Sequence, residues 1–341
     1  MSHQLQVQIH APEDVRLDFV SRPDPGPRDA VVRVQACGIC GSDVGYVKVG
    51  GMMGPTDQPM PIGHEFSGVI ESVGSEVTGV SPGDRVVVDP QGAGNQIGNG
   101  GSEGAFTPRI LVRNVSDARS LIPIPDALSF ELAALAEPLG VGMQAVNRAR
   151  AKAGERAVVF GAGPIGLSAV ATLHDRGIQE IVAVDFSDTR LAVAQELGAS
   201  YGFNPGREKV WRKIEEVHGQ SEVYGSTVAA TEVFIEASGA PQVIPEIISR
   251  ASSGARIAVV ALHRKEVPIN FLSVMMKEVE LIGSIAQPAD WDDMLEMLIR
   301  CDLSPMITHR FELEHFLEGM AVAQDPDAGA KVMIQMDTGA A

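Results

Sequence analysis

The stretch VVFGAGPIGLSAVATLHDRGIQEIVAVD, residues 158–185, decides the fold of the second part of this chain. A short apolar, β-branched run at 157–160 is followed by three glycines in the spacing G-x-G-x-x-G and then by an apolar helical run. Glycines at these positions let the backbone turn tightly, let a pyrophosphate approach the helix N-terminus, and let the helix pack close to its strand. We therefore predict a strand, turn and helix that hold a dinucleotide against Gly161, Gly163, Pro164, Ile165 and Gly166.

The second strand of this unit, expected at 181–185, ends in an acidic residue about 20 positions beyond the glycines. The Asp185 carboxylate at that place would accept hydrogen bonds from the adenosine ribose hydroxyls and would repel a 2′-phosphate, so NAD is favoured over NADP. Arg190 lies nearby and either weakens that preference or is a solvated helical arginine. A buried strand and helix without a ligand is the alternative to the whole interpretation.

Composition limits the class of protein. A chain of 341 residues is long enough for two domains, and 45% hydrophobic with 21% charged residues is typical of a soluble protein. The net charge of −17 argues against a nucleic-acid partner, because neutralising phosphates needs clustered Lys and Arg. Residues 157–173 are uncharged but slightly short for a membrane span, and their glycines fit a turn. Three cysteines and no visible secretory signal lead us to expect a cytoplasmic protein.

The pattern of apolar residues changes along the chain. The first part carries short strand-like runs separated by turn residues, at 5–9, 15–20, 31–34, 69–73 and 85–88, which predict a small β-barrel. A helix is expected at 130–149. Strands and helices alternate from residue 157 onward, which predicts an α/β fold with a doubly wound parallel sheet. A helix at 291–299 and a strand at 332–335 end the pattern.

Three short motifs outside the glycine turn contain residue types that can bind metals: CGICGSD at 37–43, GHE at 63–65 and AEPL at 136–139. A catalytic zinc takes about three sulfur, nitrogen or oxygen ligands and keeps one position open. Each residue alone has a simpler interpretation, since a buried cysteine is usually an inert small hydrophobe. The motifs together favour a zinc site.

With the glycine turn and the KVMI near the end, these motifs resemble the zinc-dependent medium-chain dehydrogenase/reductase family, which includes alcohol and polyol dehydrogenases such as those acting on sorbitol. The resemblance covers essentially the whole chain. It implies a Rossmann domain that interrupts a GroES-like β-barrel catalytic domain, with breaks that give residues 1–138, 139–283 and 284–341. It also implies a homodimer or homotetramer.

By family position, Cys40 is the thiolate ligand and His64 the imidazole ligand, and the third place falls to Glu65 or Glu137, which the sequence does not decide. The resemblance assigns Cys37 a structural role. The family's second, structural zinc uses four cysteines, whereas residues 89–106 contain none. We predict one catalytic zinc per subunit and no structural zinc.

The same resemblance assigns Ser42 to the start of the proton relay and Asp43 to ordering the surroundings of the metal. Many relatives carry a histidine two residues after this aspartate, and Gly45 stands there instead. Tyr46 matches a substrate-pocket position of polyol dehydrogenases and Phe106 is a weaker pocket candidate. Either could equally be a packing residue.

Further cofactor contacts are expected at the carboxyl ends of later strands, at Ser238, Ala261 and Ser284. His263, next to Arg264 and Lys265, reads as a solvated loop residue.

The reaction implied by the resemblance is hydride transfer from a secondary hydroxyl of a polyol, sugar or vicinal diol to NAD, giving a ketone and NADH. Sorbitol-type members carry an arginine–tyrosine pair where Ala286 and Gln287 stand, which weakens a specific assignment to sorbitol. One alternative is the same mechanism on threonine or a simple secondary alcohol. Another is a zinc-free protein similar to quinone reductases.

Overall fold

The computed structural model describes residues 3–115, 119–288 and 290–336, and the chain divides into two compact units. Unit 1 contains residues 1–137 and 307–341, and unit 2 contains residues 138–306. The chain therefore leaves the first unit and returns to it. The first break falls after residue 137, against an expected 138, and the second falls after Met306 and not after Gly283.

Unit 1 is built mainly from antiparallel strands. A seven-stranded sheet has the order β17-β18-β3-β5-β6-β8, with β7 also paired to β3, and a three-stranded sheet has the order β2-β1-β4. Its elements are β1 His3–Ala11, β2 Asp14–Ser21, β3 Ala30–Gly38, α1 Gly41–Val49, β4 Met60–Pro61, β5 Glu65–Val73, β6 Arg85–Val88, η1 Gly92–Gly94, β7 Arg109–Val112, β8 Leu121–Pro123, α2 Phe130–Ala134, β17 Ile307–Glu312, η3 Leu313–His315, α10 Phe316–Gln324 and β18 Lys331–Gln335.

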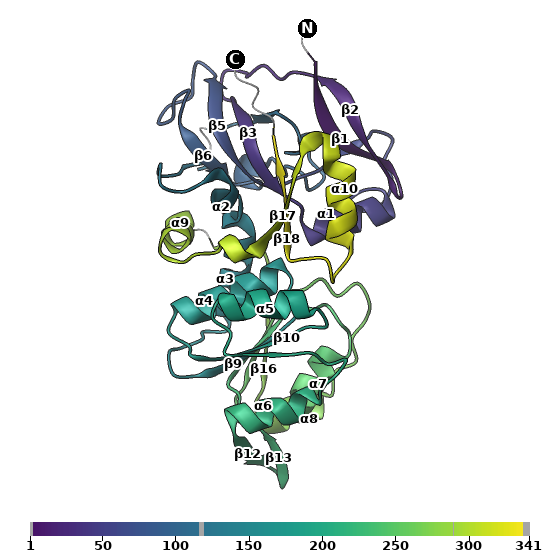
Figure 1. Cartoon of the computed structure of the whole chain (residues 1–341), viewed down its shortest axis with the longest axis vertical. Coiled ribbons are helices and arrows are strands. Elements are labelled where there is room, and N and C mark those ends of the chain that lie inside the picture. Colours follow the sequence, from purple (N-terminus) through teal and green to yellow (C-terminus); the bar gives the residue numbers. More distant parts are fainter. Residues whose placement is uncertain (1–2, 116–118, 289, 337–341) are drawn as a thin grey trace. The chain divides into compact units, whose positions relative to one another are not determined.

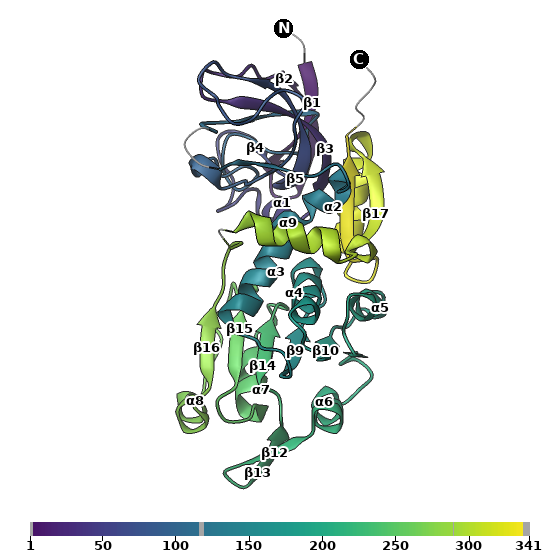
Figure 2. The same ribbon diagram turned by 90° about the vertical axis from the view of Figure 1, so that its left-hand side faces the viewer.

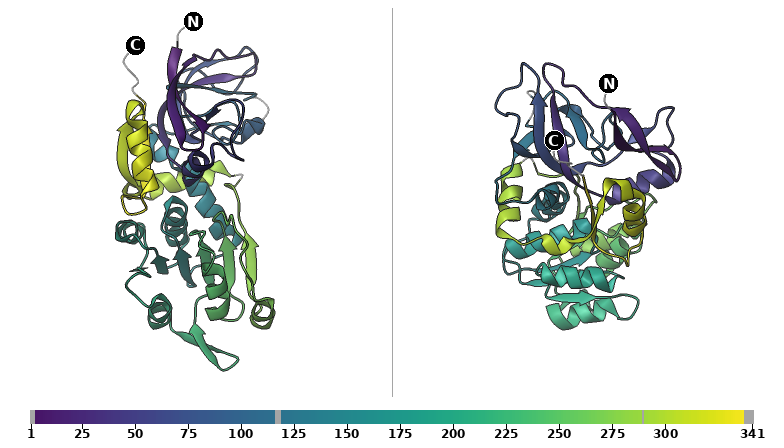
Figure 3. Two further views of the ribbon diagram at one scale, coloured as in Figure 1. Left: turned by 90° about the vertical axis from the view of Figure 1, so that its right-hand side faces the viewer. Right: turned by 45° about the horizontal axis from the view of Figure 1, so that its top comes forward.

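Segments from the beginning and the end of the sequence pair with each other in this unit. Strand β18, drawn in yellow in Figure 3, pairs antiparallel with β3, and Ile334 stands opposite Cys37. Helix α10 packs on β18, and Phe316 at its start lies with its ring centroid 4.8 Å from that of the buried Phe106. The C-terminal segment thus completes the hydrophobic core of unit 1.

Unit 2 contains a six-stranded parallel sheet of order β11-β10-β9-β14-β15-β16, the doubly wound arrangement in which the strand order reverses between β9 and β14. Its elements are α3 Ala136–Arg148, which begins in unit 1, β9 Arg156–Phe160, α4 Pro164–Asp175, β10 Glu180–Val184, α5 Asp188–Glu196, β11 Tyr201–Phe203, α6 Val210–His218, β12 Gln220–Val223, β13 Ser226–Ala229, β14 Val233–Glu236, α7 Val243–Arg250, β15 Arg256–Val259, α8 Phe271–Lys277, β16 Glu280–Gly283, α9 Trp291–Arg300 and η2 Ser304–Met306.

Helices cover both faces of this sheet. Figures 1 and 2 show α4 and α5 against one face and α6 and α7 against the other. The central strands are accordingly apolar over most of their length, and in β14 the apolar residues 233–235 and the terminal Glu236 are all buried. A parallel sheet covered on both faces needs such continuous apolar strands.

The helix expected at 130–149 is two helices, α2 and α3, separated at Leu135. Pro138 accounts for the break, because a proline inside a continuous helix has no N–H to donate and its ring clashes with the carbonyl four residues earlier, here that of Ala134. A new helix that starts at Ala136 places this proline in its first turn, where it is tolerated.

Helix α9 explains the position of the second break. Its apolar face is buried, and its charged face is tied to α4 by ion pairs of Arg300 with Asp175 at 2.8 Å and of Asp293 with Arg176 at 2.6 Å. These contacts hold residues 291–300 in unit 2. Among the helices in the described ranges, none is long and apolar enough to cross a bilayer.

Candidate active site

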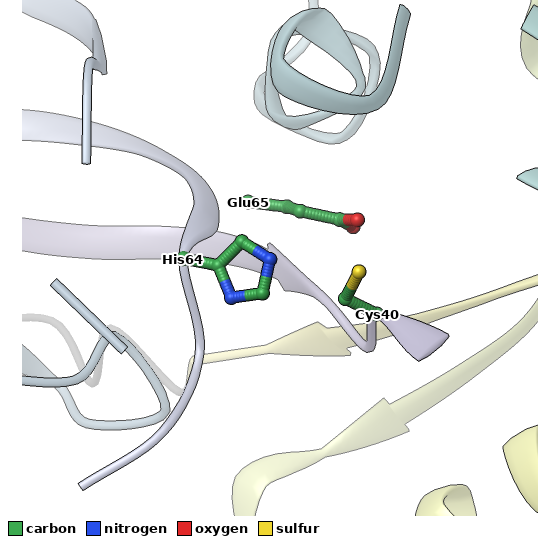
Figure 4. A group of neighbouring side chains, drawn as sticks. All are labelled: Cys40, His64 and Glu65. Atoms are coloured by element: carbon green, nitrogen blue, oxygen red, sulfur yellow. The ribbon is translucent and has the colours of Figure 1, made fainter. Parts of the chain in front are cut away.

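Two loops of unit 1 bring the metal-binding motifs together. Cys40 follows β3 directly before α1, and His64 and Glu65 stand where β5 begins. Because β3 and β5 are antiparallel neighbours with Gly38 opposite Glu65, the end of one strand meets the start of the other. One ligand atom from each of Cys40, His64 and Glu65 lies within 4.8 Å of the others. Figure 4 shows a ring nitrogen of His64 and the Glu65 carboxylate turned toward the Cys40 sulfur.

Asp43, which has no exposed surface, connects the two loops. Its carboxylate accepts hydrogen bonds from the backbone N–H of Cys40 at 2.9 Å and of Gly63 at 3.4 Å. Its Oδ1 also lies 3.6 Å from His64 Nδ1, which leaves Nε2 of that imidazole for a metal. This is the arrangement expected of a carboxylate that orients a ligating histidine.

A buried lysine, which the sequence analysis did not single out, holds Glu65. Lys331 is 1% exposed at the start of β18, and its Nζ donates to Glu65 Oε2 at 2.5 Å and to the Ile39 carbonyl at 3.0 Å. The lysine and the glutamate are 266 positions apart in sequence, so no local pattern reveals the pair. The KVMI motif that contains Lys331 was the available signal.

The charges in this pocket shift several pKa values. Burial alone would lower the pKa of His64, but the Asp43 carboxylate and the Cys40 sulfur outweigh it and raise the pKa well above its usual range. Removal from water raises the pKa of Glu137 to about 7, with Glu65 adding to the shift and His64 opposing it. A metal that binds here must displace the proton of the imidazole, so binding is coupled to pH.

The donor atoms fit a zinc ion. Within the described part of the chain, Glu65 Oε1 is buried without a hydrogen-bond partner, although a buried carboxylate oxygen normally has one. His64 Nε2 lies 3.5 Å from Ser42 Oγ. One thiol, one imidazole and one carboxylate oxygen make a ligand set that zinc accepts while keeping a fourth position open. Glu137 does not belong to the group of mutually close ligand atoms.

The remaining residues predicted around the metal take different positions. Ser42 is partly buried beside His64, as described. The buried Tyr46 donates its hydroxyl to Asn99 Oδ1 at 3.0 Å. Phe106 has no exposed surface and packs on Phe316 in the core of unit 1. Cys37 is buried in the core, and burial raises the pKa of its thiol, which fits the expected structural role.

The glycine turn of unit 2 has the predicted form. Gly161 has φ of 92°, and a Cβ there would lie 2.8 Å from the backbone of Ala237 and Ser238. Gly163 caps α4, and a Cβ added to it would meet no atom within 4 Å. Glycine at 163 therefore keeps open the space at the helix N-terminus, where a pyrophosphate would sit.

A pocket beside this turn contains three of the predicted cofactor residues. Gly161, Asp185 and Ser238 line it, together with residues that the sequence analysis missed, such as Trp211 and Val243. Asp185 Oδ2 accepts from the Ala162 N–H at 2.7 Å and Oδ1 from the Ser187 N–H at 2.9 Å. Each carboxylate oxygen has a second lone pair, so both remain able to accept from ribose hydroxyls.

The other predicted cofactor residues lie elsewhere in unit 2. Pro164, Ile165 and Gly166 form the first turn of α4. Arg190 is partly buried on α5, and Ala261 and Ser284 follow β15 and β16. None of Arg190, Ala261 and Ser284 is among the described residues that line the pocket. His263 is not a solvated loop residue, because its side chain is 12% exposed and pairs with Glu236.

A metal-ligand group in one unit and a dinucleotide cradle in the other define the class of oxidoreductases that exchange hydride with a nicotinamide cofactor. Comparisons with known proteins agree. Residues 26–126 match the alcohol dehydrogenase GroES-like domain and residues 164–300 match the zinc-binding dehydrogenase domain. The chain belongs to the zinc-dependent medium-chain dehydrogenase family.

Its relatives include human sorbitol dehydrogenase, which is 33% identical over 98% of this chain and 96% of its own. Among solved structures, 2R,3R-butanediol dehydrogenase from Bacillus subtilis superimposes with a TM-score of 0.86 at 29% identity, over 97% of this chain and 99% of the other. An Escherichia coli alcohol dehydrogenase in complex with NADH gives a TM-score of 0.85 at 25% identity, over 98% and 100%.

Proposed function

We propose that this dehydrogenase oxidises a secondary hydroxyl of a polyol, sugar or vicinal diol to a ketone, with NAD as the hydride acceptor. The convergence of Cys40, His64 and Glu65 carries the proposal, because a site without zinc has no reason to gather these ligands. The relatives that act on sorbitol and on 2R,3R-butanediol support this substrate class. Both of those compounds carry secondary hydroxyls.

One catalytic zinc per subunit is proposed, and no structural zinc, since three cysteines cannot supply a site of four thiolates. When bound, zinc would acidify a substrate hydroxyl, as it lowers the pKa of water from about 15.7 to about 7.

The protein's own residues would prepare that centre. Lys331 holds Glu65 Oε2 and leaves Oε1 free, which supports Glu65 over Glu137 as the direct third ligand. The Asp43 carboxylate, 3.6 Å from His64 Nδ1, attracts that side of the ring electrostatically and so favours the orientation in which Nε2 faces the metal. Ser42, beside that ring, is positioned to take the hydroxyl proton of the substrate and pass it on, by water or cofactor hydroxyl, since Gly45 offers no imidazole.

The preference for NAD rests on Asp185. Its carboxylate is fixed by two backbone N–H groups at the end of β10 and faces the pocket beside the glycine turn. A fixed anion there favours ribose hydroxyls and disfavours a 2′-phosphate. A homodimer or homotetramer remains a prediction from the family.

The test is NADH formation, followed by absorbance, with NAD and a panel of polyols, sugars, diols, threonine and simple secondary alcohols, before and after zinc chelation. We expect chelator-sensitive turnover with a polyol, sugar or diol. Cys40→Ser should lose both zinc and turnover, whereas the matched control Cys301→Ser, on a cysteine that contacts Asp175 in unit 2, should keep both. Turnover confined to threonine or simple alcohols would refute the substrate class, and zinc-independent reduction of quinones would favour the zinc-free alternative.

A further inference from the structure

The pair formed by Glu236 and His263 lies at the carboxyl edge of the sheet in unit 2 and has no role in the account above. Glu236 ends β14 with no exposed side-chain surface. Its Oε1 accepts hydrogen bonds from the backbone N–H groups of Ser238 and Gly239, both at 2.9 Å. Its Oε2 lies 2.7 Å from His263 Nε2. One buried carboxylate thus fixes both the turn after β14 and the histidine after β15.

The second nitrogen of this imidazole has nothing to bind in the described part of the chain. A carboxylate oxygen can only accept, so Nε2 of His263 carries the hydrogen that faces Glu236. Nδ1 is buried and has no hydrogen-bond partner. In the neutral ring Nδ1 is an acceptor, and a buried acceptor left without a donor indicates a missing ligand or water.

The position of this nitrogen in the strand order indicates which ligand it faces. In a doubly wound sheet the dinucleotide lies across the carboxyl ends of the strands, with one nucleotide on each side of the reversal. Asp185, at the end of β10, marks the adenosine side, and Ser238 after β14 still lines the pocket that contains Asp185. The strands β15 and β16, which lie farther from β10 beyond the reversal, therefore serve the nicotinamide side. Ser284 directly follows β16, and its hydroxyl is likewise buried without a partner among the described residues. Two unsatisfied polar atoms therefore follow adjacent strands on that side.

We propose that His263, held by Glu236, is a positioning and binding residue for the nicotinamide half of the cofactor, with Nδ1 accepting a hydrogen bond from a ribose hydroxyl or the carboxamide N–H. The inference rests on the proposed use of a nicotinamide dinucleotide. Orientation of this half matters more for the reaction than orientation of the adenosine, because the hydride is transferred at the nicotinamide ring.

A different role must be distinguished from this one. Glu236 also braces Ser238, which lines the pocket on the adenosine side. A histidine that only supported this turn would affect the binding of adenine nucleotides as strongly as that of the whole cofactor. The ligands chosen for the test separate the two roles.

The test is calorimetric titration of the zinc-loaded full chain with NADH, ADP-ribose and ADP, for the wild type, His263→Gln and His263→Ala. Glutamine retains a donor that can reach Glu236 but lacks an acceptor in the place of Nδ1. We expect His263→Gln to weaken NADH about three- to tenfold, the loss of one hydrogen bond, and to leave ADP unchanged. A parallel loss for ADP-ribose would assign the contact to the ribose, and an unchanged ADP-ribose would assign it to the carboxamide.

Equal weakening of NADH and ADP, or no change in either, would overturn the inference. Failure of the proposed cofactor looks different, since the wild type itself would then not bind NADH. His263→Ala, which removes both nitrogens, should weaken NADH at least as much as His263→Gln, and a smaller effect would also count against the contact.

Discussion

Lys331 provides the sharpest test of how the metal site is built. Its ammonium group is fully buried and donates to Glu65 Oε2 and to the Ile39 carbonyl. Lys331→Met keeps the length and the apolar stem of the side chain and removes the charge. The Glu65 carboxylate would then be buried without its cation, a change that costs about 3 to 5 kcal/mol in proteins. We expect a loss at the lower end of this range, about 3 kcal/mol.

The effect should be confined to unit 1. Both tryptophans, Trp211 and Trp291, are in unit 2, so their fluorescence does not follow the unfolding of unit 1. Amide hydrogen exchange of the zinc-free protein reports each segment separately. A loss of about 3 kcal/mol corresponds to exchange roughly 100-fold faster in β3 and β5, with β9 and β14 unaffected. Zinc should also bind roughly 10- to 100-fold more weakly, because Glu65 is no longer oriented.

Arg16→Met is the matched control, since it removes a cation from the solvent-exposed pair with Asp14 in the same unit. An exposed pair is largely screened by water, so exchange and zinc affinity should stay at the wild-type values. The reasoning would be refuted if Lys331→Met behaved like Arg16→Met in both measurements.

Three further predictions concern unit 2. Asp185→Ser should weaken NADH binding about tenfold or more and leave NADPH binding unchanged or tighter, as measured by titration, because it removes a charged acceptor for the ribose hydroxyls. An unchanged ratio of the NADH and NADPH affinities would refute the basis for the NAD preference. Gly163→Ala should fold normally, since the added Cβ meets no atom and the φ of this residue is −68°. It should nevertheless weaken NADH binding roughly tenfold or more, because the Cβ enters the space for the pyrophosphate. Gly166→Ala should instead reduce the yield of folded protein, because its Cβ would collide with the Gly161 carbonyl. Burial lowers the pKa of His218 to about 4, so its contribution to stability is complete above about pH 6.5 and is lost as the pH falls toward 4, by about 3 kcal/mol at most. His218→Asn can keep the contact with Thr231 and should make the urea midpoint of unit 2 less dependent on pH between those values than it is in the wild type. An unchanged pH dependence of the midpoint would contradict the role given to His218.

The sequence predicts those parts of this molecule whose physics is local. The glycine turn, α4 and the strand before Asp185 follow from spacing and apolar pattern within 28 residues, and the structure has them in place. The sequence motifs suggested Cys40 and His64 with either Glu65 or Glu137, and the pairing of β3 with β5 brings Cys40, His64 and Glu65 together across the intervening α1 and β4.

What the sequence could not predict depends on contacts between distant segments. The partner of Glu65 is 266 positions away at Lys331, and the partner of His263 is Glu236 on another strand. His263 reads as solvated because its neighbours in sequence are charged, yet its environment is set by the strand beside it. For the same reason the sequence could not decide whether Glu65 or Glu137 is the third metal ligand. Both glutamates stand in motifs that suggest metal binding, and the contact that brings Glu65 close to Cys40 comes from the pairing of β3 with β5.

Two boundaries also differ from the prediction, for different reasons. The prediction of one continuous helix at 130–149 was wrong, because Pro138, which lies inside that range, forces a second helix to begin at Ala136. The break expected after Gly283 differs from the observed one because α9 is fixed to α4 by ion pairs that no local pattern announces.

Metal content is the most direct test of the central claim, that Cys40, His64 and Glu65 form the ligand set of one catalytic zinc. Elemental analysis of protein purified without chelators should give about one zinc per chain, and the Cys40→Ser and His64→Ala variants should give close to none. The Cys301→Ser control should retain the metal. Less than about half a zinc per chain in the wild type after zinc loading, or full zinc in Cys40→Ser, would contradict the account.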